Sequence, residues 1–347
     1  MIVDDSAVVR GLVARWVEED PELEVVARHA NGKLAVEDVA FSAPDVILLD
    51  IEMPVMDGLE ALPLLLRARP EVRVLMVSTL TKRNAEISFK ALSLGALDYV
   101  PKPDTNREIT VLPDFRGEVI RKIKAISTAR QDAARKADVA GAFHPFKTRA
   151  FSLVPPRVIV IGSSTGGPQA LTSLVEVLSP SLDRVPVLIA QHMPPMFTTI
   201  LAERLARATG REAKEGVNGE LLRPGTIYVA PGNFHMTLRR SAPPQLSIAN
   251  GPPVNFCRPS ADPLFTSVAA VFGPAALAIV LTGMAQDGAE GARAIADAGG
   301  SVMAQDEASS VVWGMPGAAA ATGACAALLP PLGIAEAAAK LIRGARP

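Results

Sequence analysis

Acidic, hydroxyl and amino side chains follow short apolar segments in the N-terminal third of the chain. They are Asp4, Asp5, Asp50, Ser78 and Lys102. Carboxylates placed close together repel one another unless a divalent cation lies between them, and Mg²⁺ accepts such oxygens while it retains waters for a phosphoryl donor. A nearby lysine neutralises phosphoryl oxygens, and a hydroxyl can hydrogen-bond one. This combination of residue types predicts a Mg²⁺-dependent phosphoryl-transfer site.

A glycine-flanked serine marks a second candidate site in the C-terminal half. The apolar run Val-Ile-Val-Ile leads into Gly-Ser-Ser-Thr-Gly, in which Ser164 is the centre of a G-x-S-x-G pattern. The glycines of this pattern permit a sharp strand-to-helix turn that presents the serine hydroxyl beside free helix amides, and such amides stabilise an oxyanion. A phosphate-binding glycine loop is the alternative. It is less favoured because the loop lacks both G-x-G-x-x-G and the Gly-Lys-Ser/Thr of a P-loop.

A histidine and an aspartate follow two other apolar runs of the same half. His192 comes after Val-Leu-Ile-Ala-Gln, and Asp287 comes after Leu-Thr-Gly-Met-Ala-Gln. A serine hydroxyl becomes a strong nucleophile when a neutral imidazole accepts its proton, and a carboxylate fixes the tautomer of that imidazole. We therefore expect Ser164, His192 and Asp287 to form a catalytic triad.

Each of these residues, taken singly, also has an ordinary structural explanation. Asp4 and Asp5 are suited to cap a helix, Lys102 to lie in solvent, His192 to serve as a structural histidine, and Asp287, which precedes a glycine, to act as an N-cap. Their joint placement at the ends of apolar runs favours the chemical explanation.

Three other residues compete for roles in the second site. His235 follows Ala-Pro-Gly-Asn-Phe, and this position indicates at most a contact at the rim of the site. Cys257 has no glycine turn or helix start before it and ranks lower still as a nucleophile. Cys325 lies in an alanine-rich stretch that predicts a helix, so we expect it in the core.

The elements that position these residues follow from alternating apolar runs and helical stretches. The runs of the first half are residues 24–28, 46–49, 72–77 and 98–100, and those of the second begin near residues 157, 187, 226, 277 and 301. Repeated βα units build parallel sheets whose carboxyl edges carry functional groups. We expect an α/β fold with two domains, residues 1–125 and 152–347, joined by a linker at 126–151.

Length and composition support two globular domains and exclude several classes of protein. The chain has 347 residues, of which 49% are hydrophobic and 20% charged, with a net charge of −1. No apolar run is long enough to cross a bilayer, and the first residues carry charges where a signal peptide needs an apolar segment. Two cysteines and no targeting segment predict a cytoplasmic protein. Residues 151–347 carry 14 Lys and Arg against 13 Asp and Glu, which argues against nucleic-acid binding.

The N-terminal segments Val-Asp-Asp-Ser-Ala-Val-Val-Arg, Leu-Leu-Asp-Ile-Glu-Met-Pro-Val-Met-Asp-Gly and Asp-Tyr-Val-Pro-Lys-Pro closely resemble the receiver domain of two-component response regulators. The resemblance implies a flavodoxin-like doubly wound sheet. It also implies that Asp50 is the phosphoacceptor, that Asp4 and Asp5 bind Mg²⁺ with it, and that Ser78, Tyr99 and Lys102 transmit the signal. Only three residues precede Asp4, so we expect a short first strand.

The C-terminal segments Ile-Gly-Ser-Ser-Thr-Gly-Gly, Ala-Gln-His-Met-Pro-Pro-Met-Phe-Thr, Arg-Pro-Ser-Ala-Asp-Pro-Leu-Phe and Leu-Thr-Gly-Met-Ala-Gln-Asp-Gly closely resemble the chemotaxis protein-glutamate methylesterases of the CheB family. The resemblance implies a doubly wound α/β methylesterase domain with Ser164 as nucleophile, His192 as general base and Asp287 as its orienting carboxylate. It makes Thr165 and Met284 candidate oxyanion contacts. Ala285 replaces a glycine that is usual in the family.

Together the two resemblances imply a phosphorylation-regulated enzyme of chemotaxis adaptation. It would hydrolyse glutamate γ-methyl esters on methyl-accepting chemoreceptors, release methanol and also deamidate receptor glutamines, with a chemotaxis histidine kinase as phosphodonor. Ester hydrolysis would need no cofactor, whereas phosphorylation of Asp50 would need Mg²⁺. The alternative is a response regulator whose C-terminal half is a non-catalytic binding adaptor.

Overall fold

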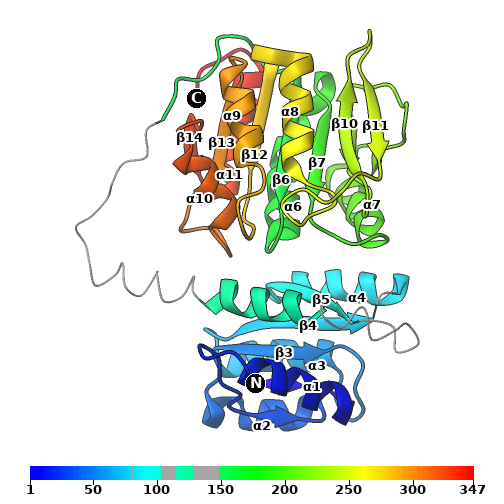
Figure 1. Cartoon of the computed structure of the whole chain (residues 1–347), viewed down its shortest axis with the longest axis vertical. Helices are drawn as coiled ribbons and strands as arrows, with labels where there is room; N and C mark the ends of the chain where they lie inside the picture. The colour runs from blue at the N-terminus through cyan, green and yellow to red at the C-terminus, as the bar shows by residue number, and fades with distance from the viewer. Residues whose placement is uncertain (80, 103–114, 128–147) are drawn as a thin grey trace, which may run out of the picture. The chain divides into compact units, whose positions relative to one another are not determined.

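The computed structural model describes residues 1–79, 81–102, 115–127 and 148–347. Contacts between residues divide the chain into two compact units, residues 1–140 and 141–347 (Figure 1). Most of the predicted linker at 126–151 lies outside the described residues, so the domain ends at 125 and 152 remain predictions. None of the helices in the described parts of the chain is long and apolar enough to span a bilayer.

The first unit contains a five-stranded parallel sheet in the order β2-β1-β3-β4-β5. Its strands are β1 (Ile2–Val3), β2 (Arg28–His29), β3 (Val46–Asp50), β4 (Arg73–Thr79) and β5 (Asp98–Lys102). The prediction of a short first strand is confirmed, since β1 has two residues and pairs with β2 on one side and β3 on the other. The strand predicted at residues 24–28 is β2, which has only two residues and begins at Arg28.

Helices of this unit begin at residues whose side chains bond free backbone amides. They are α1 (Ala7–Glu18), α2 (Gly32–Ser42), α3 (Gly58–Ala68) and α4 (Lys82–Ser93), and residues 115–127 are also helical. Ser6 caps α1, Asn31 caps α2, and Asp57 with Glu60 forms a capping box at α3. On one face of the sheet, α1 and the helix at 115–127 share an apolar core.

The second unit contains a seven-stranded sheet in the order β14-β13-β12-β6-β7-β9-β8, and every pairing in it is parallel. Its strands are β6 (Val158–Ser163), β7 (Val187–Gln191), β8 (Ala213–Glu215), β9 (Ile227–Val229), β12 (Ala276–Val280), β13 (Ser301–Gln305) and β14 (Ala327–Leu329). The doubly wound α/β prediction is confirmed, whereas the short strands β8 and β14 were not predicted. Strand β8, Ala-Lys-Glu, carries no apolar run, and β14, Ala-Leu-Leu, lies in the alanine-rich stretch that predicted a helix.

Helices cover both faces of this sheet. They are α6 (Gly167–Leu178), α7 (Phe197–Thr209), α8 (Ala261–Phe272), α9 (Ala289–Asp297), α10 (Gly314–Ala321) and α11 (Pro331–Ile342), with short 3₁₀ segments at Ser179–Arg184 and Gly273–Ala275. Helix α8 packs against α9 on one face and α6 against α11 on the other (Figure 1). An antiparallel hairpin of β10 (His235–Arg239) and β11 (Gln245–Ala249) lies beside α8.

The strand order reverses at the centre of the sheet, and this places the second candidate site. Strand β6 lies between β7 and β12, and the chain proceeds from β6 to β7 on one side and from β12 to β13 on the other. Side chains that follow the carboxyl ends of strands at such a switch point converge on one crevice. Ser164, His192 and Asp287 follow β6, β7 and β12.

Candidate functional site

The turn after β6 has the shape that the G-x-S-x-G pattern predicts. Gly166 adopts a left-handed backbone with φ +74° as it starts α6, which is unfavourable for residues with a side chain. A Cβ on Gly162 would lie 2.7 Å from the Cβ of Ala261, so only glycine lets β6 approach α8 this closely. The end of β6 therefore lies against the start of α8, and Ser164 follows in the turn that leads into α6, where its amide donates to the Thr282 oxygen at 3.0 Å.

Ser163 and Ser164 differ in what their hydroxyls do. The buried Ser163 hydroxyl donates to Oε1 of Gln191 at 2.6 Å, and Nε2 of Gln191 donates to the backbone oxygen of Ser164 at 2.9 Å. Ser164 is partly exposed. Ser163 and Gln191 thus hold the turn, and the Ser164 hydroxyl is left for chemistry. The role of Gln191 was not predicted, although it directly precedes His192 in the sequence.

The imidazole of His192 is held by a buried carboxylate. Its Nε2 lies 2.7 Å from Oδ2 of Asp287. A carboxylate only accepts hydrogen bonds, so an ionised Asp287 places the ring proton on Nε2 and leaves Nδ1 as the basic nitrogen. This is the arrangement that a general base requires.

Asp287 receives hydrogen bonds from the start of α8. The Ser260 hydroxyl donates to Oδ1 at 2.6 Å, the Ala261 amide to Oδ2 at 2.6 Å and the Asp262 amide to Oδ1 at 3.2 Å. Burial alone would raise the pKa of Asp287, but the bonds from His192, Ser260 and Ala261 outweigh it and lower the pKa. Asp287 is therefore ionised at neutral pH and stabilises the N-terminus of α8, not that of the helix which follows it in sequence.

A second carboxylate lies beside this pair. Nδ2 of Asn255 is 2.7 Å from Oδ2 of Asp262 and 3.0 Å from Oδ1 of Asp287, so one amide bridges two acidic side chains. Burial and then the charge of Asp287 raise the pKa of Asp262 to about 6, against the hydrogen bond from the Gly291 amide. The sequence pattern did not identify Asn255 or Ser260, because their partners are distant in the chain.

The other nitrogen of His192 faces a thiol. Sγ of Cys257 lies 3.4 Å from Nδ1 of His192. Burial disfavours the imidazolium, but the contacts with Asp287 and Cys257 outweigh burial and raise the pKa of His192. Among the hydrogen bonds of the described residues, none joins the Ser164 hydroxyl to His192. The local sequence around Cys257 indicated no role in the site. The fold nevertheless brings its thiol to the imidazole.

The candidate oxyanion residues lie on two turns of the same crevice. Thr165 is buried, and its backbone oxygen accepts from the Thr282 hydroxyl at 2.9 Å. Met284 is partly buried and precedes Ala285, whose φ of +60° explains why glycine is usual at that position. Their oxyanion role remains a prediction.

Two residues weighed from the sequence lie elsewhere. Nε2 of the buried His235 lies 3.0 Å from the backbone oxygen of Pro252, so the ring supports a loop. Cys325 is buried as expected, but the helix predicted around it is wrong because α10 ends at Ala321 and Cys325 follows in the connection to β14. Gly323, with φ +70°, lies between that helix and the cysteine.

The acidic residues of the first unit come together at the carboxyl edge of its sheet. Carboxylate oxygens of Asp4, Asp5 and Asp50 lie within 4.8 Å of one another. Nζ of Lys102 is 2.7 Å from Oδ2 of Asp4 and 2.7 Å from Oδ2 of Asp50. Burial raises the pKa of Asp50 to about 6, although Lys102 opposes this shift. Three hard oxygen donors at this spacing fit Mg²⁺.

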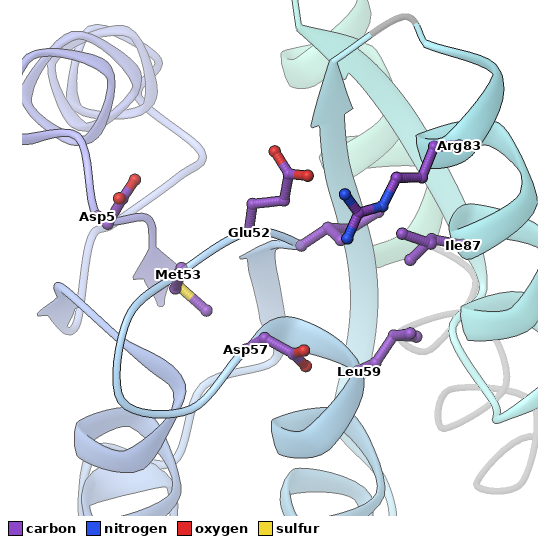
Figure 2. Close-up of a pocket in the computed structure, with 8 residues that line it drawn as sticks. Asp5, Glu52, Met53, Asp57, Leu59, Arg83 and Ile87 are labelled. Atoms are coloured by element: carbon purple, nitrogen blue, oxygen red, sulfur yellow. The ribbon is translucent and has the colours of Figure 1, made fainter.

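A hollow of about 430 Å³ adjoins the acidic residues (Figure 2). Asp5 lines one side of it, and Figure 2 shows Arg83 of α4 extending toward Glu52 in the loop after β3. This hollow is large enough for a small phosphodonor beside the carboxylates, with a guanidinium available for its charge.

The three residues expected to transmit a signal occupy different surroundings. Lys102 contacts the carboxylates, whereas the buried Ser78 hydroxyl lies 3.1 Å from the hydroxyl of Ser88 in α4. Tyr99 is buried, and Nζ of Lys122 lies 5.2 Å from the centre of its ring. The structure therefore brings Lys102 to Asp50 and places Ser78 against α4.

Comparisons with known proteins identify a family for each of the two units. Residues 1–112 match the response regulator receiver domain, and residues 159–338 match the CheB methylesterase family. A protein of Rhodopseudomonas palustris (strain HaA2) named protein-glutamate methylesterase/protein-glutamine glutaminase is 53% identical over 95% of this chain and 90% of its own length. One of the same name from Nitrobacter hamburgensis is 52% identical over 99% of this chain and 93% of its own. The crystal structure of the Thermotoga maritima CheB methylesterase catalytic domain, 37% identical, covers 55% of this chain and 99% of its own with a TM-score of 0.52.

Proposed function

The chain belongs to the CheB methylesterase family and carries a response regulator receiver domain, and from this premise we propose that it hydrolyses glutamate γ-methyl esters on chemoreceptors and releases methanol. The observation that carries the proposal is the pair of His192 and the buried Asp287 beside the serine turn, with Nε2 and Oδ2 at 2.7 Å. A histidine oriented by a carboxylate beside a partly exposed serine is the arrangement that acyl transfer requires.

In the proposed reaction Ser164 attacks the ester carbonyl carbon while Nδ1 of His192 accepts the hydroxyl proton. The proton then passes to the leaving methoxide, and methanol departs from the acyl-enzyme. Water attacks the acyl-enzyme with His192 again as the base, which restores Ser164 and leaves a glutamate carboxylate. Asp287 stabilises the imidazolium in both steps, and amides of the turns that contain Thr165 and Met284 stabilise the oxyanion.

The same groups account for a second activity in the name of the relatives. In deamidation of glutamine the amide nitrogen accepts the proton from His192 and leaves as ammonia, just as the methoxide oxygen accepts it and leaves as methanol. The carbonyl and the oxyanion are unchanged, so one site serves both reactions. We assign both methylesterase and glutaminase activity to Ser164, His192 and Asp287.

The receiver domain makes the enzyme responsive to phosphorylation. Asp50 is the phosphoacceptor, Lys102 neutralises the incoming phosphoryl oxygens, and Asp4, Asp5 and Asp50 hold Mg²⁺. Bound Mg²⁺ would neutralise charge on the phosphoryl group. Ester hydrolysis uses only the triad and the oxyanion contacts. The phosphodonor is a chemotaxis histidine kinase, and the protein acts in the cytoplasm, where such kinases and the methylated receptor segments lie.

Methanol release from methylated receptor membranes tests the function directly. Membranes whose receptors carry radioactive methyl esters are incubated with the purified chain and phosphodonor, and volatile radioactivity is measured. We expect methanol release that depends on Ser164. Binding to the membranes without release would support the non-catalytic adaptor instead.

A further inference from the structure

Phe256 lies at the tip of a two-residue turn next to the triad. The Val254 amide donates to the Cys257 oxygen at 3.1 Å, and the Cys257 amide donates to the Val254 oxygen at 2.9 Å. The two residues between them, Asn255 and Phe256, have φ of +51° and +62°. A turn of this type favours Asn and then Gly, so a phenylalanine at its second position is held in an unfavourable conformation.

The turn is anchored on both sides of that ring by residues of the site. Asn255 donates to Asp287 at 3.0 Å, and Cys257 lies 3.4 Å from His192. The ring of Phe256 contributes nothing to this anchoring, because the residue is 97% exposed. None of these contacts gives the exposed ring a part in stabilising the fold. Strained backbone conformations of this kind are concentrated at functional sites.

Two neighbouring turns carry further exposed apolar side chains. Met196 follows β7 with φ +69° and is 37% exposed, and Phe234 follows Asn233, whose φ is +66°, and is 39% exposed. The Asn233 amide donates to the Arg258 oxygen at 3.2 Å, and Gly232 lies against Pro194 and Pro195. The turns that carry Met196, Phe234 and Phe256 therefore adjoin one another at the rim of the crevice.

We propose that Phe256 is a substrate-contact residue, which packs on apolar side chains of the receptor helix that flank the methylated glutamate. This proposal rests on the proposed function and deepens it. When a glutamate side chain of a receptor helix enters the crevice, the helix residues three and four positions away lie over the rim. The ring of Phe256, between Asn255 and Cys257 in sequence, lies where those residues would contact the enzyme. An aromatic residue with few rotamers is suited to such a contact.

Four full-length chains test the proposal: wild type, Phe256→Gly, Phe256→Leu and Phe41→Ala. Phe41 is the matched control, since it is 92% exposed in the receiver domain. Each chain is assayed with and without phosphodonor on methylated receptor membranes and on a small methyl ester. We expect Phe256→Gly to raise KM for receptor membranes about 10-fold with little change in kcat, and to leave the small ester unaffected. Phe256→Leu should recover most of the loss, and Phe41→Ala should match wild type.

Thermal unfolding separates this role from a structural one. Glycine relieves the left-handed backbone, so Phe256→Gly should keep or raise the melting temperature while it weakens receptor binding. A lower melting temperature, with both substrates affected equally, would make Phe256 a structural residue and overturn the proposal. Unchanged KM in Phe256→Gly would also overturn it, as would a higher kcat without phosphodonor, which would assign the ring to a contact within the chain.

Failure of the proposed function gives a different result. If the wild-type chain released no methanol, co-sedimentation of each chain carrying Ser164→Ala with receptor membranes would still report the contact. Weaker sedimentation of Phe256→Gly alone supports the role of Phe256 in binding, and equal sedimentation of all chains contradicts it.

Discussion

Cys257 and His192 are 65 residues apart in sequence, yet Sγ of the cysteine lies 3.4 Å from Nδ1 of the histidine, the nitrogen that is not bonded to Asp287. In this arrangement the thiol occupies the position from which Ser164 must give up its proton. The ring is therefore oriented for catalysis by Asp287, while its basic nitrogen is in contact with a thiol.

Replacing Cys257 by alanine should extend activity to lower pH. The thiol helps to raise the pKa of His192, and the imidazole acts as a base only in its neutral form, above that pKa. Without the thiol the pKa falls, so the acid limb of the kcat/KM profile moves to lower pH. The contacts of the ring raise the pKa of His192 to about 10, so profiles of wild type and Cys257→Ala between pH 6 and 11 measure the shift. Complete loss of activity in Cys257→Ala would instead make Cys257 the nucleophile.

Ser164→Ala should lower kcat by several orders of magnitude, because only binding and oxyanion stabilisation remain. Ser163→Ala should retain most of the activity. It leaves Oε1 of Gln191 without its donor, so we expect a loss of about 1–3 kcal/mol in the free energy of unfolding. Turnover and chemical denaturation of the two variants separate these effects. Equal losses of turnover would contradict the assignment of Ser164.

Asp287→Asn should destabilise the catalytic domain at neutral pH but not in strong acid. The folded protein lowers the pKa of Asp287, so its carboxylate contributes stability above the ordinary Asp pKa of about 4, and that stability is lost as the pH falls toward the lowered value. We expect the variant to lose about 1–3 kcal/mol at pH 7. The difference between wild type and variant should shrink below pH 4, as measured by urea unfolding. A difference that did not change with pH would show that Asp287 acts through shape, not charge.

Phosphorylation should depend on Asp50 and on Mg²⁺. Incubation with a small phosphodonor should give an acid-stable, base-labile adduct, because an aspartyl phosphate is a mixed anhydride. Removing the metal with EDTA or replacing Asp50 by asparagine should abolish it. Asp5→Asn should raise the Mg²⁺ concentration needed for half-maximal labelling, since it replaces one of the three carboxylates by a neutral amide. A label that persists in Asp50→Asn would identify a different acceptor.

Residues 152–347 alone should hydrolyse receptor methyl esters faster than the unphosphorylated full chain. A coupling of about 1–3 kcal/mol between receiver and esterase is enough to change activity about 5- to 150-fold. Phosphodonor should raise the activity of the full chain but not that of the fragment. The test compares the rates of methanol release by the full chain and by the fragment on the same methylated membranes. A full-length chain that equals the fragment and ignores phosphodonor would rule out autoinhibition.

The sequence by itself determined the fold class, the positions of most strands along the chain and the turn around Ser164. Apolar runs of strand length, glycines at a strand-to-helix junction and polar residues at run ends are local signals, and parallel sheets convert the last of these into shared crevices. For this reason the convergence of Asp4, Asp5, Asp50 and Lys102 followed from their positions in the chain. The short strand β8, Ala-Lys-Glu, left no local signal, and the alanine-rich connection that holds Cys325 and leads into β14 resembled a helix in composition.

Only the tertiary structure decided what surrounds the imidazole and its carboxylate. Cys257, Asn255 and Ser260 reach His192 and Asp287 because β6 packs closely on α8 and because the turn before α8 has a left-handed backbone. These contacts depend on the direction of side chains that lie 27 to 65 residues apart in sequence, and no local pattern encodes that direction. Secondary structure forms from neighbours in the chain, whereas the partners of a buried polar group are selected by how whole elements pack.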